Sequence, residues 1–199
     1  MPAIAGIVLA AGASMRMGTD KALLRWGERT FLEHLRGVLR AAGAEPVRIV
    51  TGANAATIEQ AVALAPGELV VNHAWEQGQL SSLIAGLDSL PKESEAALVC
   101  LVDHPCISST LLRALMEKFR ETRRPIVLPT YQGRRGHPVL FAAALFDELR
   151  AAPLSVGARF VVHQHAADVL EVPTDEEGIL LNTNDPAAYE RILQIPPPT

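Results

Sequence analysis

Short runs of apolar residues alternate along this chain with longer segments in which apolar positions recur at helical spacing. The runs are too short to form helices and predict strands. An alternation of this kind is typical of βαβ units, which build a mostly parallel sheet. The predicted strands are Ile4–Ala10, Val47–Thr51, Glu68–Val71, Ala97–Val102, Ile126–Leu128, Pro138–Phe141 and Val169–Val172.

Three helices have recognisable ends in the sequence. The clearest begins after Thr30, which forms a capping-box pair with Glu33, and it ends at Gly43. Asn54 and Ser108 are residue types that cap helices, and they predict the starts of two further helices. The apolar face of the first helix comprises Phe31, Leu35, Val38, Leu39 and Ala42.

The run Ala96–Val102 is apolar without alternation, as expected of a central strand that helices cover on both faces. It is followed by Asp103, His104 and Pro105. In open α/β sheets, ligands bind outside the carboxyl ends of the strands. We therefore expect Asp103 to lie at the mouth of a ligand-binding crevice. The alternative is a carboxylate that stabilises the turn before Pro105.

The composition narrows the class of protein. The chain has 199 residues, 49% of them hydrophobic, and a formal net charge of −4, which excludes a disordered tail and a polybasic nucleic-acid-binding module. The length predicts a single domain over residues 1–195 and a proline-rich tail over residues 196–199. The short apolar stretch near the N-terminus fits neither a signal peptide nor a membrane span. Cys100 and Cys106 are interpreted as reduced core thiols of a cytoplasmic protein.

The segment Leu9–Lys21 leaves the carboxyl end of the first predicted strand. It lacks the Gly-Lys-Ser/Thr of a Walker A loop and the glycine spacing of a dinucleotide fingerprint. Its small residues let backbone N–H groups approach a ligand closely, and Arg16 and Lys21 add two cations, so we predict a polyphosphate ligand. The other lysines of the chain, Lys92 and Lys118, are expected at the surface. The alternative is an ordinary βα connection with two solvent-facing cations.

The stretch Leu9–Gly18, together with Lys21, resembles the nucleotide-binding motif of the molybdenum cofactor cytidylyltransferase family, a branch of the molybdopterin nucleotidyltransferase-like enzymes. Four further segments resemble family motifs in the same order, so the resemblance spans nearly the whole chain. It implies a three-layer α/β/α Rossmann-like nucleotidyltransferase fold with a mostly parallel, mixed sheet. The four segments are Asn72 with Trp75 and residues 78–87, residues 101–105, residues 135–141 and residues 157–159.

The same resemblance implies an activity, in which CMP is transferred from CTP to the terminal phosphate of molybdopterin and pyrophosphate is released. Lys21, Arg16 and Asp103 would be catalytic, and Asp103 would also hold Mg²⁺. The sequence Ala10-Ala11-Gly12 resembles the cytidylyl branch, whereas the guanylyl branch usually has Ala-Gly-Gly, so CTP is favoured over GTP. The implied nucleotide-binding residues are Leu9, Ala10, Ala11, Gly12, Lys21, Asn72, Ser81 and Ser82, and the implied acceptor-binding residues are His104, Arg135, His137 and Arg159.

Two departures from the family pattern keep other functions open. Residues 153–159 lack the Asp of the family's Gly-Asp-x-Gly-Ala-Arg string, and Asn182 and Asn184 stand where the cytidylyl branch usually has carboxylates. One alternative is a nucleotidylyltransferase that acts on a sugar or alcohol phosphate. Another is a non-catalytic nucleotide- or cofactor-binding accessory protein for a molybdenum hydroxylase, which is also a candidate recipient of the product.

Several aromatic and histidine side chains admit two interpretations. Trp75 either packs in the protein or stacks on a base, and packing is favoured. His137, in a loop beside Arg135, either contacts an anionic acceptor or lies in a solvated turn. His163 follows a segment with helical character, so a metal-binding pair with His165 is not expected.

Overall fold

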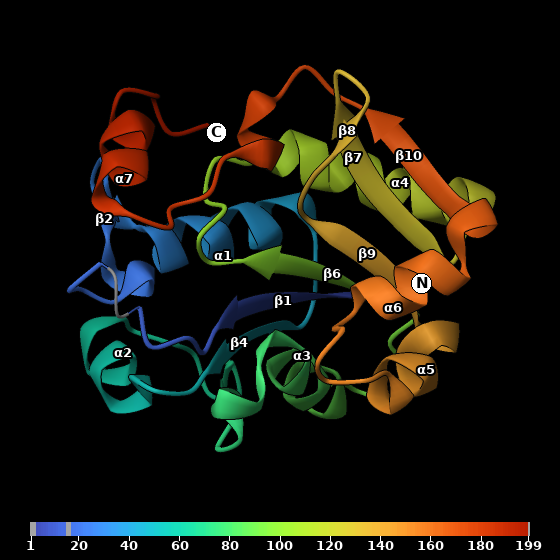
Figure 1. The fold of residues 1–199 in the computed structure, drawn as a ribbon, viewed down its shortest axis with the longest axis horizontal. Helices are drawn as coiled ribbons and strands as arrows, with labels where there is room; N and C mark the ends of the chain where they lie inside the picture. The colour runs from blue at the N-terminus through green and yellow to red at the C-terminus, as the bar shows by residue number, and fades with distance from the viewer. Residues whose placement is uncertain (1–2, 15–16, 199) are drawn as a thin grey trace.

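The structure is a computed structural model and describes residues 3–14 and 17–198. In this part of the chain an eight-stranded sheet has the order β10-β7-β9-β6-β1-β4-β5, with β8 paired to β7 (Figure 1). β2 and β3 form a separate two-stranded ribbon. The strands are β1 (Ile4–Ala10), β2 (Arg25–Trp26), β3 (Arg29–Thr30), β4 (Val47–Thr51), β5 (Leu69–Val71), β6 (Ala96–Leu101), β7 (Ile126–Tyr131), β8 (Arg134–Arg135), β9 (Val139–Ala142) and β10 (Val169–Pro173).

The sheet is mixed and mostly parallel, as predicted. β1 pairs in parallel with β4 and β6, β4 pairs in parallel with β5, and β7 pairs in parallel with β10. β9 lies antiparallel between β6 and β7, and the short β8 is antiparallel to β7. The carboxyl ends of β1, β4 and β6 therefore meet at one edge of the molecule, on the left in Figure 1.

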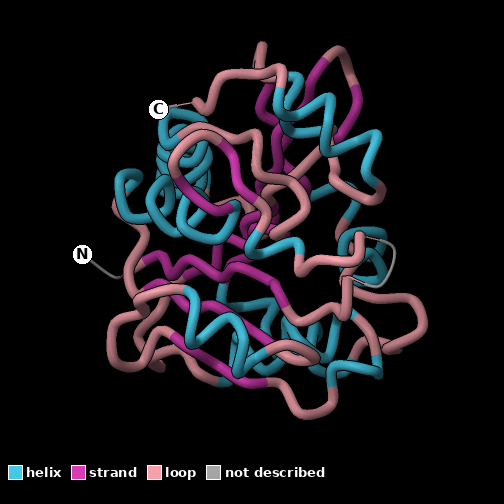
Figure 2. The backbone as a smooth tube through the Cα atoms, turned by 90° about the vertical axis from the view of Figure 1, so that its left-hand side faces the viewer, coloured by secondary structure: helices cyan, strands magenta, loops and turns pink. Residues whose placement is uncertain are grey.

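Helices cover both faces of the sheet and give the three layers that the resemblance implies (Figures 1 and 2). α1 and α4 pack on the face that includes Ile4 and Val8, while α3 and α5 pack on the face that includes Ile7 and Leu9. This division follows from the two-residue period of β1, whose side chains are all buried. The helices are α1 (Phe31–Ala42), α2 (Ala55–Ala61), α3 (Gln79–Asp88), α4 (Ser109–Thr122), α5 (Phe146–Ala151), α6 (Arg159–Gln164) and α7 (Pro186–Leu193).

The predicted strands all occur, with small displacements of their ends. β7 continues to Tyr131 rather than ending at Leu128, because β8 pairs with its last two residues. β6 covers Ala96–Leu101 rather than Ala97–Val102. Pairing with a neighbouring strand, which apolar runs do not reveal, therefore decides where a strand ends.

Two predicted helix caps are confirmed. Thr30 Oγ1 accepts from the backbone N–H of Glu33 at 3.2 Å, and the Glu33 carboxylate accepts from the Thr30 N–H at 2.8 Å. Ser108 Oγ accepts from the backbone N–H of Leu111 at 3.0 Å and caps α4. Gly43 ends α1 in the left-handed conformation, with φ of 89°, which glycine adopts without steric cost.

The predicted helix start at Asn54 is confirmed, because Asn54 is the N-cap residue of α2. Its side chain, however, makes no capping hydrogen bond. Its Nδ2 instead donates to Asp20 Oδ2 at 2.7 Å, across 34 residues of sequence, and ties α2 to the loop that follows β1. The Asn54 side chain therefore bonds a residue distant in sequence and not the first turn of α2.

Residues 174–185, which we call the C-terminal strap, connect β10 to α7 and pass against the loop that follows β6. A Cβ at Gly178 would overlap the carbonyl oxygen of Cys106, so this close approach requires glycine. Further along, the N–H of Thr183 donates to the carbonyl oxygen of Asp103 at 2.8 Å. The strap thus brings a distant part of the chain beside Asp103.

Two further features are the length of the apolar helices and the environment of the two cysteines. Within residues 3–14 and 17–198, no helix is long and apolar enough to cross a membrane. Cys100 and Cys106 are buried free thiols, and burial raises the pKa of each to about 12. Their interpretation as core thiols is confirmed.

Candidate active site

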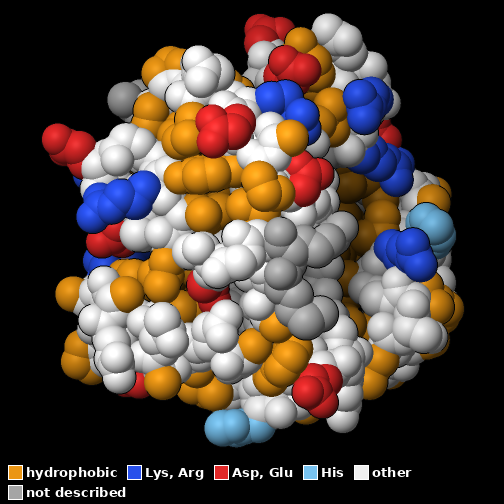
Figure 3. Space-filling model, turned by 60° about the vertical axis from the view of Figure 1, so that its left-hand side comes forward, with side chains coloured by type: hydrophobic (Ala, Val, Ile, Leu, Met, Phe, Trp, Pro, Cys, Tyr) orange, Lys and Arg blue, Asp and Glu red, His pale blue; other side chains and the backbone are white. Residues whose placement is uncertain are grey.

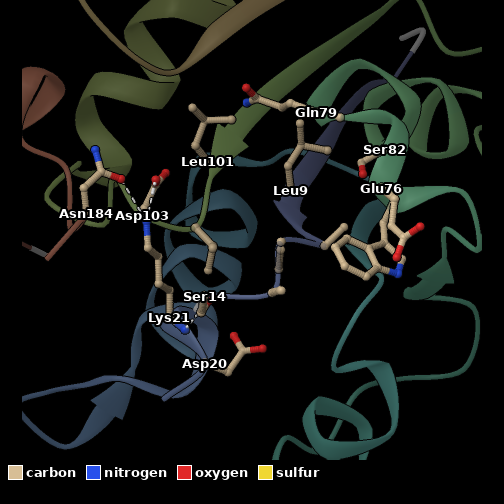
Figure 4. A pocket seen from close by; sticks show the side chains of 17 residues that line it. Leu9, Ser14, Asp20, Lys21, Glu76, Gln79, Ser82, Leu101, Asp103 and Asn184 are labelled. Carbon is tan, nitrogen blue, oxygen red and sulfur yellow. Dashed lines mark hydrogen bonds and ion pairs between the residues drawn. The ribbon is translucent and has the colours of Figure 1, made fainter. Parts of the chain in front are cut away.

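A cavity of about 480 Å³ lies at the carboxyl ends of β1 and β6. Figure 4 shows Lys21, Asp103 and Asn184 together on one side of it, and Glu76 and Ser82 on the other. The walls come from the loop after β1, the turn before α3, the end of β6 and the C-terminal strap. The lining residues are Leu9, Ala10, Ala11, Gly12, Ala13, Ser14, Asp20, Lys21, Trp75, Glu76, Gly78, Gln79, Ser82, Leu101, Val102, Asp103 and Asn184.

The ammonium group of Lys21 is held by two side chains in this cavity. Its Nζ lies 3.1 Å from Asp103 Oδ2 and 2.9 Å from Asn184 Oδ1, and the side chain is 15% exposed. These partners are 82 and 163 residues away in sequence. The structure therefore brings the predicted residues Lys21 and Asp103 together. It adds Asn184, which the sequence presents only as a departure from a family pattern.

Local hydrogen bonds shape the loop that carries Lys21. The backbone N–H of Lys21 donates to Ser14 Oγ at 3.0 Å. The Asp20 carboxylate accepts from the N–H of Ala22 at 2.8 Å and from the Asn54 amide, so both of its oxygens are used within the protein. Asp20 consequently supports the loop, and Lys21 presents its ammonium group to the cavity.

The small residues of this loop leave room for a ligand. Leu9, Ala10, Ala11 and Gly12, the predicted nucleotide-binding residues of the loop, all line the cavity. A Cβ at Gly12 would meet no atom within 4 Å, so the backbone at this position is open to a ligand. Arg16, predicted to be catalytic, lies outside the described residues.

Asn72 and Ser81 lie behind the cavity wall. Asn72 Nδ2 donates to Ser81 Oγ at 2.9 Å and to Ser82 Oγ at 3.0 Å, and Asn72 Oδ1 accepts from a backbone N–H of the following turn at 2.9 Å. These bonds hold the turn that presents Trp75 and Glu76 to the cavity. Of the three predicted residues in this segment, Ser82 faces the cavity, whereas Asn72 and Ser81 support it.

A second cavity, of about 510 Å³, adjoins the first, and the two share Leu9, Gln79 and Leu101 in their linings. Figure 3 shows a hollow on this side of the molecule with hydrophobic side chains at its floor and basic and histidine side chains at its edge. The apolar lining includes Leu80, Leu83, Val99, Leu128, Val139, Phe141, Val156 and Val162, and the polar rim includes Arg135, His137, Arg159 and His163.

Three of the four predicted acceptor-binding residues line the second cavity: Arg135, His137 and Arg159. Arg135 pairs with Glu171 through two nitrogens, at 2.8 and 2.7 Å, and Arg159 Nε donates to a backbone carbonyl of the preceding turn at 2.9 Å. His104 does not line this cavity. Its ring packs on that of His137, with centroids 4.9 Å apart and planes inclined by 56°.

Sequence reasoning does not identify Glu76 and His163 as site residues, although both line a cavity. The available signal for Glu76 is its position beside Trp75, in a segment that resembles a family motif. His163 belongs to the helical segment after Arg159, and its spacing from Arg159 places both side chains on one helix face.

Residues 6–169 match the family model of the MobA-like NTP transferase domain. The chain belongs to this family. It is 37% identical over 189 residues to nicotine blue oxidoreductase from Paenarthrobacter nicotinovorans, covering 89% of this chain and 91% of the relative. It is also 32% identical over 196 residues to a probable molybdenum cofactor guanylyltransferase from Opitutus terrae, covering 95% of this chain and 94% of the relative.

Solved structures agree with this family. The crystal structure of Rv0371c from Mycobacterium tuberculosis H37Rv matches with a TM-score of 0.87 at 29% identity, over 98% of this chain and 100% of that chain. A complex of Rv0371C with manganese matches with a TM-score of 0.81 at 26% identity, over 97% of this chain and 98% of that chain. The predicted fold and the predicted enzyme class, a nucleotidyltransferase, are confirmed.

Two histidine rings in contact, those of His104 and His137, form a polar pair beside the second cavity of this MobA-like transferase. Burial lowers the pKa of His104. Burial, with a further contribution from the neighbouring His104, lowers the pKa of His137 to about 4. Within the described residues, the Nδ1 atoms of both rings are buried without a hydrogen-bond partner. At neutral pH these rings offer hydrogen-bonding nitrogens rather than positive charge.

The carboxylate in the first cavity suits a divalent metal ion that is also held by substrate phosphates. Among the residues that the structure describes, no three His, Cys, Asp or Glu side chains form a metal-binding group. Asp103 offers one carboxylate, 26% exposed, in the cavity wall. Mg²⁺ prefers oxygen ligands, keeps several waters, and is usually bound by one or two carboxylates together with substrate phosphates. Asp103 suits this kind of site and not a cage made wholly of protein ligands.

Proposed function

We propose that this protein transfers a nucleoside monophosphate from a nucleoside triphosphate to the terminal phosphate of molybdopterin and releases pyrophosphate. The observation that carries the proposal is the pair of adjoining cavities. One contains Lys21 and Asp103, which suit a triphosphate and its metal. The other has an apolar floor and a polar rim that includes Arg135 and Arg159, which suit a heterocyclic ligand that bears a phosphate. Their shared wall at Leu9 and Leu101 brings the two substrates within reach of each other.

Nucleotidyl transfer is an in-line displacement at the α-phosphorus, to which a protein contributes mainly positioning and charge neutralisation. Lys21 neutralises the phosphates that leave as pyrophosphate. Asp103 would hold Mg²⁺, which would supply further neutralisation of the phosphate charge. The acceptor phosphate is already an anion, so the reaction needs no general base from His104 or His137.

We propose CTP as the nucleotide, on the basis of Ala11. This residue lines the cavity. The methyl group of Ala11, which a glycine would lack, narrows the cavity at this point and favours a pyrimidine over the larger guanine. The similarity to a probable guanylyltransferase from Opitutus terrae favours GTP as the second candidate.

The similarity to nicotine blue oxidoreductase favours a candidate of another class, an oxidoreductase. The apolar floor of the second cavity suits an apolar substrate. An oxidation or reduction leaves a nucleoside triphosphate intact, and the consumption of the triphosphate therefore distinguishes the two activities.

Pyrophosphate release in the presence of Mg²⁺, with CTP, GTP, ATP or UTP and with or without molybdopterin, tests the proposed function. We expect release with CTP that depends on molybdopterin. Because one methyl group in a pocket discriminates by about tenfold or more, Ala11→Gly should raise the rate with GTP relative to CTP by about that factor.

Other outcomes reassign the function. A higher rate with GTP than with CTP in the native protein reassigns the nucleotide. Release with a sugar or alcohol phosphate but not with molybdopterin reassigns the acceptor. Tight nucleotide binding without release, even with molybdopterin, indicates the accessory role, and substrate reduction with intact triphosphate indicates the oxidoreductase.

A further inference from the structure

The charge of Lys21 is balanced by a single carboxylate. Its Nζ bonds Asp103 Oδ2 at 3.1 Å and Asn184 Oδ1 at 2.9 Å, and Figure 4 shows the three side chains converging. Asn184 is uncharged, so Lys21 and Asp103 neutralise each other. Of the other acidic side chains in the described lining, Asp20 has both oxygens bonded within the protein, and Glu76 lies on the opposite side.

These hydrogen bonds engage the oxygen atoms that a divalent cation would use. Mg²⁺ and Mn²⁺ bind carboxylate, carbonyl and phosphate oxygens. A free cation that approaches Asp103 finds Oδ2 already bonded to the Lys21 ammonium, and the same ammonium repels it at close range. A triphosphate removes this conflict, because its oxygens accept from Lys21 and ligate the cation at the same time.

We propose that Asn184 is a positioning residue that holds Lys21 against Asp103, so that the cavity takes up its divalent cation together with a nucleoside triphosphate rather than alone. The inference rests on the proposed function in requiring a triphosphate ligand. When the nucleotide binds, Lys21 keeps its bond to Asn184 and exchanges Asp103 for phosphate oxygens. Asp103 is then released to the cation.

The uncharged amide at position 184 is essential to this behaviour. A carboxylate at the same position would place one ammonium between two carboxylates and leave a net charge of about −1, which attracts a free cation at short range. The residue that departs from the family pattern therefore makes cation binding depend on the nucleotide.

The backbone around Asn184 is held independently of its side chain. The N–H of Thr183, a fully buried residue, donates to the Asp103 carbonyl oxygen at 2.8 Å. On the other side, the Asp185 carboxylate accepts from the N–H of Ala188 at 2.8 Å and caps α7. Asn184→Asp therefore changes the charge of the cluster while the side-chain size and the backbone position are preserved.

Titration with Mn²⁺ in the absence of nucleotide, followed by the electron paramagnetic resonance signal of the free ion, tests the proposal. The native protein is expected to bind Mn²⁺ weakly, and Asn184→Asp is expected to bind it at least about tenfold more tightly. The matched control is Asn182→Asp, the same chemical change at an exposed position outside the cavity lining, which should bind Mn²⁺ as the native protein does.

Lys21→Met removes the ammonium group and so frees the oxygens of both Asp103 and Asn184 for a cation. Its affinity for Mn²⁺ without nucleotide should also rise by about tenfold. In the native protein, addition of CTP or GTP should raise Mn²⁺ affinity by at least that factor. Thermal unfolding of each variant establishes that it is folded.

Two results would overturn the inference: native protein that binds free Mn²⁺ as tightly as Asn184→Asp does, or unchanged Mn²⁺ affinity in both Asn184→Asp and Lys21→Met. Neither measurement includes molybdopterin. Failure to release pyrophosphate with molybdopterin would therefore refute the proposed function. The Mn²⁺ titration would still support or overturn the inference about Asn184.

Discussion

Lys21 is held at both its backbone and its side chain, through Ser14 on one side and through Asp103 and Asn184 on the other. Lys118, in contrast, is an exposed lysine that pairs with Glu121 one helical turn away at 2.7 Å. Exposed pairs of that kind contribute little to stability, because solvent screens them. The charge of Lys21 is the one directed into a cavity.

We expect Lys21→Ala to lower the rate of nucleotidyl transfer by about 10² to 10³-fold, the usual cost of losing one directed electrostatic contact. Pyrophosphate release measures this effect, and thermal unfolding checks that the fold is retained. Lys92→Ala, at an exposed position, is the control and should keep the native rate. A near-native rate in Lys21→Ala would exclude Lys21 from the mechanism.

At the scale of elements, the C-terminal strap connects the fold to the active site. Gly178 allows it to pass against Cys106, and Thr183 binds it to Asp103. Between these points the buried Ile179 accepts from the N–H of His137 at 3.0 Å. The strap therefore bonds one residue of each cavity, Asp103 and His137.

Gly178→Ala tests the strap. The added methyl group overlaps the Cys106 carbonyl, and overpacking of this kind typically costs about 1–3 kcal/mol of the free energy of unfolding. Gly37→Ala is the matched control: its Cβ meets the end of the flexible Arg29 side chain at 3.3 Å, and removal of a glycine from a helix interior should stabilise by about 0.5–1 kcal/mol. Urea unfolding measures both. Equal stability of Gly178→Ala and native protein would contradict the role given to Gly178.

α1 carries a buried histidine that makes stability depend on pH. His34 is 4% exposed, packs on Trp26 with ring centroids 5.0 Å apart, and has Nε2 3.4 Å from Ile107 O. Burial lowers the pKa of His34 below its ordinary value of 6.5. As the pH falls, the unfolded chain takes up this proton before the folded chain does. The contribution to stability is thus complete above about pH 6.5 and is lost progressively below it.

The free energy of unfolding of the native protein should therefore fall between about pH 7 and about pH 5, and that of His34→Gln should fall less. Urea unfolding across this range gives both slopes. His73→Gln, at an exposed position, is the control and should keep the native slope. Identical slopes for His34→Gln and native protein would show that His34 does not contribute to the pH dependence.

At the scale of the whole molecule, the net charge of the protein is negative, and so is the charge of the proposed ligand. The chain carries a formal charge of −4, yet its first cavity holds Lys21 where the proposed triphosphate binds. Net charge governs solubility and long-range steering, whereas the charges within one cavity govern what that cavity binds. A negative protein is therefore compatible with a highly anionic ligand.

Binding of nucleotide to the folded state should raise the stability of the whole chain. At a nucleotide concentration of about 100 times Kd, the gain is about 2.7 kcal/mol. Thermal unfolding with CTP, GTP, ATP and UTP, each with and without Mg²⁺, measures this gain and ranks the nucleotides. A protein whose unfolding temperature responds to none of the four would contradict nucleotide binding.

Local signals in the sequence were sufficient for much of the fold. The Thr30–Glu33 capping box and the Ser108 cap depend on residues within one helical turn, and the apolar runs identify the strands. The antiparallel entry of β9 and the extension of β7 to Tyr131 depend on partner strands, which no local pattern specifies.

By itself, the sequence determined the strands, the Thr30 and Ser108 helix caps, the expectation of a phosphate-binding loop and the position of Asp103 after a central strand, because each is a property of neighbouring residues. Only the tertiary structure decided that Lys21 bonds both Asp103 and Asn184, that the Asn54 side chain bonds Asp20 instead of the first turn of its helix, and that two cavities share a wall. These contacts join residues 34 to 163 positions apart, and the packing of the complete chain determines which of them meet.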